Sequence, residues 1–309
     1  SVLDVPENTK CISVNAGVNH SLALFENNKV YAWGVSSSGQ LGDNTHEDRL
    51  SAFKVIGLPK DIEVVKIIGS CDSSIVLLAN GDIYASGKII DSLIFKQYKL
   101  DFKVKDVEML YCNNYDNAIV LLDNNNKIFI KNISRSSELS WCDHDENSFF
   151  EPKGLHEDAI VTKLIGGGCQ LHVLTQKNIL YGIGNNDSGQ IGNNSKERAD
   201  SFQKIYGMDG QIIQIIANHS SHSSSIESNF LLVLTDTSLY GWGANQDYQL
   251  GMKVHKRNRY VESGFIFKDN HTYTYYFEQK PKVIGHLSKQ INFENDIDLF
   301  SHNIHTMDN

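Results

Sequence analysis

Short apolar or alternating runs recur along the chain, and none extends into a convincing helical stripe. Three such runs, each bounded by Gly, Asn or Ser, lie at residues 12–14, 21–24 and 30–33. Alternation over so few residues predicts half-buried β-strands. Asn- and Gly-rich turns separate consecutive runs, at residues 27–29, 80–82 and 124–127. Such turns need residues that tolerate positive φ, so we expect tight β-hairpins.

The same order of runs and turns repeats along the chain. Residues 16–45 align without a gap on residues 166–195, and residues 239–251 repeat the end of this unit. The Gly-Gln-Leu-Gly motif at 39–42 recurs as Gly-Gln-Ile-Gly at 189–192. Internal repeats of this kind predict that one structural unit is built several times and stacked.

Two weaker copies, at 67–87 and 110–130, fall between the clear ones. About four short strands in each stretch of about 50 residues is typical of a propeller blade. We therefore predict an all-β fold, with a single β-propeller domain over residues 1–309. The expected repeats are approximately 9–60, 61–105, 106–155, 156–207, 208–285 (with an insertion at 253–281) and a partial repeat at 286–309.

Composition narrows the class of protein. The chain has 309 residues, of which 40 % are hydrophobic, and a formal net charge of −9. Binding to the phosphate backbone of a nucleic acid needs a basic surface, and this chain is acidic, so we expect no nucleic-acid partner. No run approaches the roughly 18 apolar residues of a membrane-spanning helix, and no signal peptide is visible. Five widely spread cysteines without a Cys-x-x-Cys pair predict free thiols in a reducing compartment.

Motifs for covalent catalysis are absent from the sequence. The chain lacks Gly-x-Ser-x-Gly, a phosphate-binding Gly-x-x-x-x-Gly-Lys-Ser/Thr loop and His-Glu-x-x-His. We therefore expect no catalytic residue, no cofactor and no metal. The acidic stretch 143–146 and the pair His219 and His222 are alternatives for a weak metal site. However, adjacent residues rarely converge on one ion, and calcium-loop spacing is missing.

Three motifs of the first unit together resemble the repeat of the regulator of chromosome condensation family. They are Ala-Gly-x-x-His-Ser-x-Ala-Leu at 16–24, Val-Tyr-x-Trp-Gly at 30–34 and Ser-Gly-Gln-Leu-Gly at 38–42. The resemblance spans essentially the whole chain and implies the β-propeller of that family, which usually has seven blades. Five full repeats plus partial terminal repeats predict about six blades, or a fragment of seven. The repeated glycines, with Trp33 and Trp242, are expected to be scaffold between blades.

The resemblance also implies residues that contact a partner. In the family, acids and histidines around the first turn of the repeat, and a position just before Gly-Gln-Leu-Gly, line the face that binds a small GTPase. The corresponding partner-binding candidates here are Asp72, Asp187, His20 and His305. The alternative for the two histidines is a side chain hydrogen-bonded to a turn.

The fifth repeat carries an insertion, at residues 253–281. Its first part is basic, and its second part places β-forming residues around a polar turn, which predicts a protruding hairpin. Aromatic and basic side chains are typical interface anchors, and the family's exchange factor contacts its GTPase with such a hairpin. The candidate contacts are Lys256, Arg257, Arg259, Tyr260, Phe265, Phe267, Tyr273 and Tyr275. The alternative is a loop that packs on the rim of the propeller.

Two functions from different classes remain open. The first is a protein-binding β-propeller that regulates a small GTPase, as a Ran-type guanine-nucleotide exchange factor or a GTPase-binding effector. The second is a non-catalytic scaffold or adaptor, such as a ubiquitin-ligase module or a protein inhibitor, without exchange activity. In either case we expect a monomer in the cytoplasm or shared between nucleus and cytoplasm, or in the host cytosol for a bacterial effector.

Overall fold

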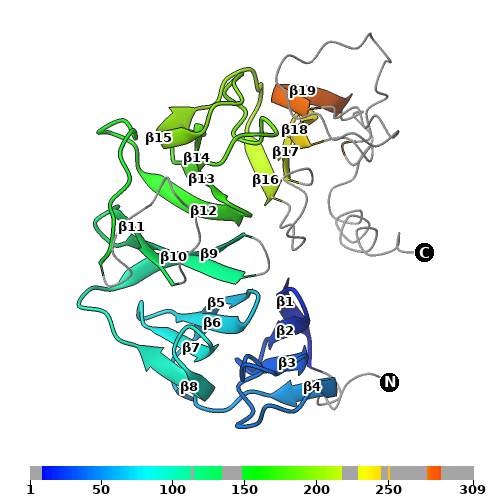
Figure 1. Ribbon diagram of the computed structural model, residues 1–309, viewed down its shortest axis with the longest axis vertical. Helices are drawn as coiled ribbons and strands as arrows, with labels where there is room; N and C mark the ends of the chain where they lie inside the picture. The colour runs from blue at the N-terminus through cyan, green and yellow to red at the C-terminus, as the bar shows by residue number, and fades with distance from the viewer. Residues whose placement is uncertain are drawn as a thin grey trace, which may run out of the picture.

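The computed structural model describes residues 9–112, 115–133, 148–217, 229–244, 250 and 277–286. Within them the chain forms short antiparallel strands that group into five sheets. Figure 1 shows the sheets following one another along an arc, each with its first strand on the inner side. Sheets arranged in this way are the blades of a propeller, so the expected all-β propeller fold is confirmed.

Four of the five blades contain four strands in sequence order. The first two blades consist of β1 (Cys11–Ala16), β2 (His20–Phe25), β3 (Val30–Gly34), β4 (Arg49–Lys54), β5 (Val64–Gly69), β6 (Ser73–Leu78), β7 (Ile83–Gly87) and β8 (Ser92–Tyr98). The fourth and fifth blades consist of β12 (Val161–Gly167), β13 (Gln170–Thr175), β14 (Leu180–Gly184), β15 (Ala199–Lys204), β16 (Ile212–Ala217), β17 (Phe230–Thr235), β18 (Ser238–Ala244) and β19 (Phe277–His286). Strand β19 begins inside the range 253–281 that the sequence predicts as an insertion.

The third blade departs from this pattern, as its degenerate repeat suggests. Its sheet contains β9 (Val104–Cys112), β10 (Tyr115–Asp123) and β11 (Ile128–Asn132). At the outer edge, Phe150 occupies the place of a fourth strand through a single bridge to Ile130. Two backbone hydrogen bonds of 2.8 Å, one in each direction, join Phe150 and Ile130. The outer edge of this blade is therefore paired at one residue, at about the separation along the chain that joins the third and fourth strands of the other blades.

Asparagines in three hairpin turns attach the first, third and fourth blades to the blade that follows each of them. Asn28, Asn126 and Asn178 all adopt positive φ, near 60°, in the turn between the second and third strands. Each side-chain oxygen accepts a bond from the first backbone N–H of the next inner strand, as Asn126 Oδ1 does from Val161 N at 2.6 Å. Each side-chain nitrogen donates to a carbonyl just before that strand. Asparagine is favoured here because it tolerates positive φ and also supplies both partners.

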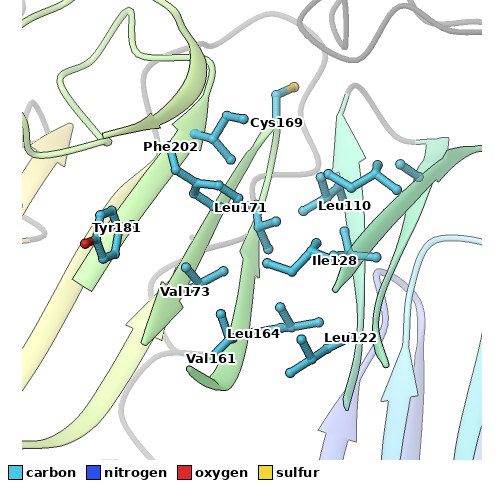
Figure 2. Close-up of a cluster of buried hydrophobic side chains, with 14 residues drawn as sticks. Leu110, Leu122, Ile128, Val161, Leu164, Cys169, Leu171, Val173, Tyr181 and Phe202 are labelled. Carbon is cyan, nitrogen blue, oxygen red and sulfur yellow. The ribbon is translucent and has the colours of Figure 1, made fainter. Parts of the chain in front are cut away.

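The hydrophobic core lies mainly between blades. Figure 2 shows Leu110 and Ile128 of the third blade facing Leu171 and Leu164 of the fourth. These side chains are almost completely buried. Full burial of one such side chain stabilises the fold by about 1.5–3 kcal/mol. A single blade cannot bury both of its faces, so each depends on its neighbours.

The Gly-Gln-Leu-Gly loops also join neighbouring blades. Gln40 lies in the β3–β4 loop, and its carbonyl accepts hydrogen bonds from Ser74 Oγ at 2.7 Å and Ser86 Oγ at 3.2 Å in the second blade. In the fourth blade, the equivalent Gln190 carbonyl accepts a 3.0 Å bond from Trp242 Nε1 of the fifth. Trp242 is fully buried between blades, as expected for scaffold.

One expectation about the cysteines is wrong. Cys169, in the turn between β12 and β13, is disulfide-bonded rather than a free thiol. Cys11 is a free and exposed thiol, and Cys71 is buried. Spacing along the sequence did not predict this disulfide, because bonding depends on the distance between two cysteines in space.

Candidate functional site

One end of the strands carries the long connections of the propeller. Because strands alternate in direction, the first-to-second and third-to-fourth connections of each blade emerge at the same face. We call this the loop face. It includes residues 35–48 and 185–198, and the connection between β18 and β19 also begins and ends there. At the opposite face the second-to-third connections are short turns, as at 26–29 and 176–179.

Asp187 lies on the loop face, in the β14–β15 loop, and is exposed. Its carboxylate accepts a 3.1 Å hydrogen bond from Asn185 Nδ2, and its backbone N–H donates to Asn185 Oδ1 at 3.0 Å. Burial lowers the pKa of the nearby Lys196, and the Asp187 carboxylate acts in the opposite direction. The side chain is therefore held in a defined turn while its carboxylate stays accessible to a partner.

Asp72 also lies on the loop face, in the turn between β5 and β6. It is partly buried and forms an ion pair with Lys88, at 3.9 Å between Oδ2 and Nζ. Ion pairs at this distance and exposure contribute little to stability. Asp72 and Asp187 share a face but belong to the second and fourth blades, so the structure does not unite them in one cluster.

His20 occupies a different environment from these two acids. It begins β2 and is buried, and its Nε2 lies 2.9 Å from Ser74 Oγ of the second blade. Burial lowers the pKa of His20 to about 4, so the imidazole is neutral at pH 7. In this geometry the ring links two blades, and its hydrogen bond goes to strand β6 of the second blade rather than to a turn.

The fourth blade replaces this arrangement with residues that the repeat pattern does not single out. Gln170 stands at the position of His20 and is fully buried, with neither amide atom hydrogen-bonded. His172, also fully buried, stands at the position of Leu22. Gly182, opposite His172 on β14, leaves room for the ring, since a Cβ there would lie 3.0 Å from Nε2. Burial lowers the pKa of His172 to about 4.

A group of charged side chains joins the inner strands of the second and third blades. Lys66 Nζ donates to Asp106 Oδ1 at 2.8 Å and to Glu108 Oε2 at 3.2 Å. Asp106 Oδ2 in turn accepts from Leu164 N of the fourth blade at 2.9 Å. Burial lowers the pKa of Lys66, but the two carboxylates together outweigh it and raise that pKa. We interpret this group as a structural bridge across three blades.

Exposed carboxylates outnumber exposed cations on the described part of the loop face. Glu47, Asp48, Asp91, Asp187 and Glu197 are exposed there, against Lys88 and Arg198. This distribution produces a negative potential toward an approaching partner.

The remaining predicted contacts lie outside the described residues. They are His305, Lys256, Arg257, Arg259, Tyr260, Phe265, Phe267, Tyr273 and Tyr275. Across the described ranges, His, Cys, Asp and Glu side chains form no group of three or more placed to hold a metal ion. In the same part of the chain, no helix is long and apolar enough to cross a membrane.

Comparison with known proteins identifies the repeat. Residues 11–40 match the family model of the regulator of chromosome condensation (RCC1) repeat. The human E3 ubiquitin-protein ligase HERC2 is 27 % identical over 261 residues, covering 78 % of this chain and 5 % of HERC2. The RCC1-like G exchanging factor-like protein of Mus musculus is 34 % identical over 88 residues, covering 28 % of this chain and 19 % of that protein. The chain thus spans under one fifth of either relative.

The solved structure of Prp20p from Saccharomyces cerevisiae shares the fold. It superimposes with a TM-score of 0.65 at 20 % identity, over 91 % of this chain and 66 % of Prp20p. The matched motif, the repeated blades and this superposition agree. Residues 11–40 therefore form a regulator of chromosome condensation repeat, and the chain shares the β-propeller fold of Prp20p.

Proposed function

We propose that the loop face binds a protein and that this partner is a small GTPase of the Ran type, whose nucleotide exchange the propeller accelerates. One observation carries the proposal: the long connections and an excess of exposed carboxylates meet on a single rigid face. Loops held on a rigid scaffold are where binding residues concentrate. The family supports the choice of partner, since the description of Prp20p names its binding properties to Gsp1p and histones.

The exchange mechanism requires no covalent step. The propeller would bind the nucleotide-free GTPase more tightly than the loaded form, and by reciprocity it would weaken nucleotide binding by the same factor. Asp72 and Asp187 would attract a basic surface of the GTPase. The insertion at 253–281, with Tyr260 and Phe265 among its predicted contacts, would displace the loops with which the GTPase holds its nucleotide. A Ran-type partner would place the activity in the cytoplasm or nucleus.

The test is the release of a fluorescent guanine nucleotide from Ran, and from a panel of other small GTPases, with and without this chain. We expect accelerated release from one of them. Asp187→Lys should slow this release at least about tenfold, because a repulsive charge replaces an attractive one. Asp101→Lys is the matched control, since Asp101 is an exposed carboxylate in the β8–β9 connection at the opposite face. Equal effects of both substitutions would contradict the role of the loop face.

The second candidate function is a non-catalytic scaffold, and the second blade favours it. Its third-to-fourth connection contains only residues 88–91, where the first blade has 35–48. The loop face there lacks a Gly-Gln-Leu-Gly loop that could contact a GTPase. Capture of a GTPase or another protein without any change in nucleotide release would support this function instead.

A further inference from the structure

Each of the five inner strands contains a β-bulge at the same place. In β5, Val64 pairs with Leu78 and Lys66 with the adjacent Leu77, so Val65 is an extra residue. The same irregularity occurs at the second residue of β1, β9, β12 and β16. The five bulged residues are Ile12, Val65, Lys105, Thr162 and Ile213. A bulge re-aims the extra side chain, so every blade presents one such side chain at the same level.

These bulged side chains lie at the face opposite the loop face. The inner strands run toward the loop face and stand on the inner side of the arc in Figure 1, so their second residues lie near their other end. All five side chains are exposed. The three aliphatic ones have exposed fractions of 56 % for Ile12, 49 % for Val65 and 54 % for Ile213. We call the five residues the bulge ring.

The aliphatic members of the bulge ring have no evident role within the blades. Strand propensity does not account for them, because a bulged residue leaves the ladder that favours Ile and Val. Val65 belongs to the second blade, which has a blade packed on each side, so its exposure does not come from a place at the end of the arc. Ile160, directly before β12, adds a further exposed aliphatic side chain. Apolar side chains gathered on one surface mark a site that a partner covers.

The charges around the bulge ring are mostly positive. The exposed charged residues of the inner strands and of the position before each strand are Lys10, Lys103, Lys105, Lys163 and Glu63. Lys103 is paired with Asp82 at 2.6 Å. Two further carboxylates of these strands, Asp106 and Glu108, accept hydrogen bonds from Lys66. This surface therefore attracts anionic groups, although the chain as a whole has a net charge of −9.

Apolar and cationic side chains occupy different parts of the bulge ring. Ile12 and Val65 come from the first and second blades, whose inner strands are joined by a 2.7 Å hydrogen bond from Gly69 N to Asn15 Oδ1. Lys105 and Lys163 come from the third and fourth blades. Lys105 Nζ donates to Val161 O of the fourth blade at 2.9 Å, which uses one of its three donors.

We infer that the bulge ring binds an extended acidic segment of a partner protein. An aliphatic side chain of this segment packs on Ile12 and Val65, and neighbouring carboxylates pair with Lys105 and Lys163. The apolar contact supplies affinity, and the lysines set the direction of the segment. A second copy of this chain fits less well, because its own bulge ring would bring lysines against lysines. The inference is independent of the proposed GTPase function, which uses the opposite face.

Selection from a displayed library of random short peptides, with the full chain as bait, tests the inference. We expect the selected peptides to combine Leu, Ile or Val with flanking Asp or Glu. The tightest of them is then labelled and its Kd is measured by fluorescence anisotropy. Val65→Ser and Lys163→Glu should each raise this Kd at least about tenfold, as expected for a residue at the centre of an interface.

Two matched substitutions serve as controls. Leu50→Ser removes an aliphatic side chain that is 96 % exposed on β4, away from the bulge ring. Lys177→Glu reverses an exposed lysine in the β13–β14 turn, on the same face but outside the inner strands. Both controls should leave the Kd unchanged. All four substituted side chains are exposed, so we expect every variant to fold, which far-UV circular dichroism checks.

Three results would overturn the inference. The library could yield no peptide or only basic ones, or the selected peptide could bind the two bulge-ring variants as tightly as the parent chain. A dimer in light scattering that Val65→Ser dissociates would assign the bulge ring to a second copy of the chain.

Discussion

The buried histidine of the fourth blade makes the propeller sensitive to acid. His172 lies in the core between the fourth and fifth blades with neither ring nitrogen in a regular hydrogen bond. Protonation would place a charge in this buried site, where the backbone at Ile191 and Gln190 offsets only part of the lost hydration, so burial lowers the pKa of His172 from 6.5 to about 4. We therefore expect the free energy of unfolding to fall when the pH is lowered from 7 to 5.

The size of the effect follows from the two pKa values. The unfolded chain binds a proton at His172 near pH 6.5, and the folded chain does so only near pH 4. The unfolded state thus binds more protons between these values, so the stability is present above pH 6.5 and is lost as the pH falls toward 4. Between pH 7 and pH 5 the loss is about 2 kcal/mol for His172. His20, whose pKa is also lowered to about 4, adds a similar amount.

Urea denaturation followed by tryptophan fluorescence at pH 7, 6 and 5 measures this loss. The control variant combines His172→Leu with Gly182→Ala, which copies the Leu22 and Ala32 pair that faces across β2 and β3 in the first blade. The variant should lose about 2 kcal/mol less than the parent chain between pH 7 and pH 5. An identical pH dependence in both proteins would show that His172 is not buried as the structure places it.

Three further predictions concern contacts between blades, each measured by urea denaturation. Asn126→Gly keeps the positive φ but removes two hydrogen bonds to the fourth blade, so it should cost about 1–3 kcal/mol. Asn44→Gly, at an exposed position with φ of 68°, should cost under about 0.5 kcal/mol, and equal losses would contradict the proposed clamp. Gly57→Ala should cost about 2–4 kcal/mol because its Cβ would collide with the second blade. Gly207→Ala, with nothing within 4 Å, should cost only about 1 kcal/mol, so a similar penalty at both sites would refute the packing argument. Asp106→Asn should cost about 1–3 kcal/mol by weakening the partly buried ion pair with Lys66, and a loss that vanishes in high salt would instead indicate a surface effect.

Local structure in this chain was largely predictable. The hairpin at Asn28 followed from an alternating run on each side of a turn that needs positive φ, and the structure places φ at 60° there. The role of the Asn28 side chain was not predictable, because its partners Ile62 and Val64 lie in the next repeat. In the same way, the repeat marked His20 as a candidate contact, whereas only the structure showed the ring facing Ser74.

The sequence by itself determined the blade, and the tertiary structure decided how blades meet. Strand alternation and turn residues act over a few positions, so they specify the strands and hairpins of each unit without reference to a neighbouring blade. Contacts between blades join residues about one repeat apart, such as His20 and Ser74 at a separation of 54, or Lys66 and Asp106 at 40. No local pattern links such positions. Their partners are fixed only when packed blades exclude water and bring the polar groups of neighbouring repeats within hydrogen-bonding distance.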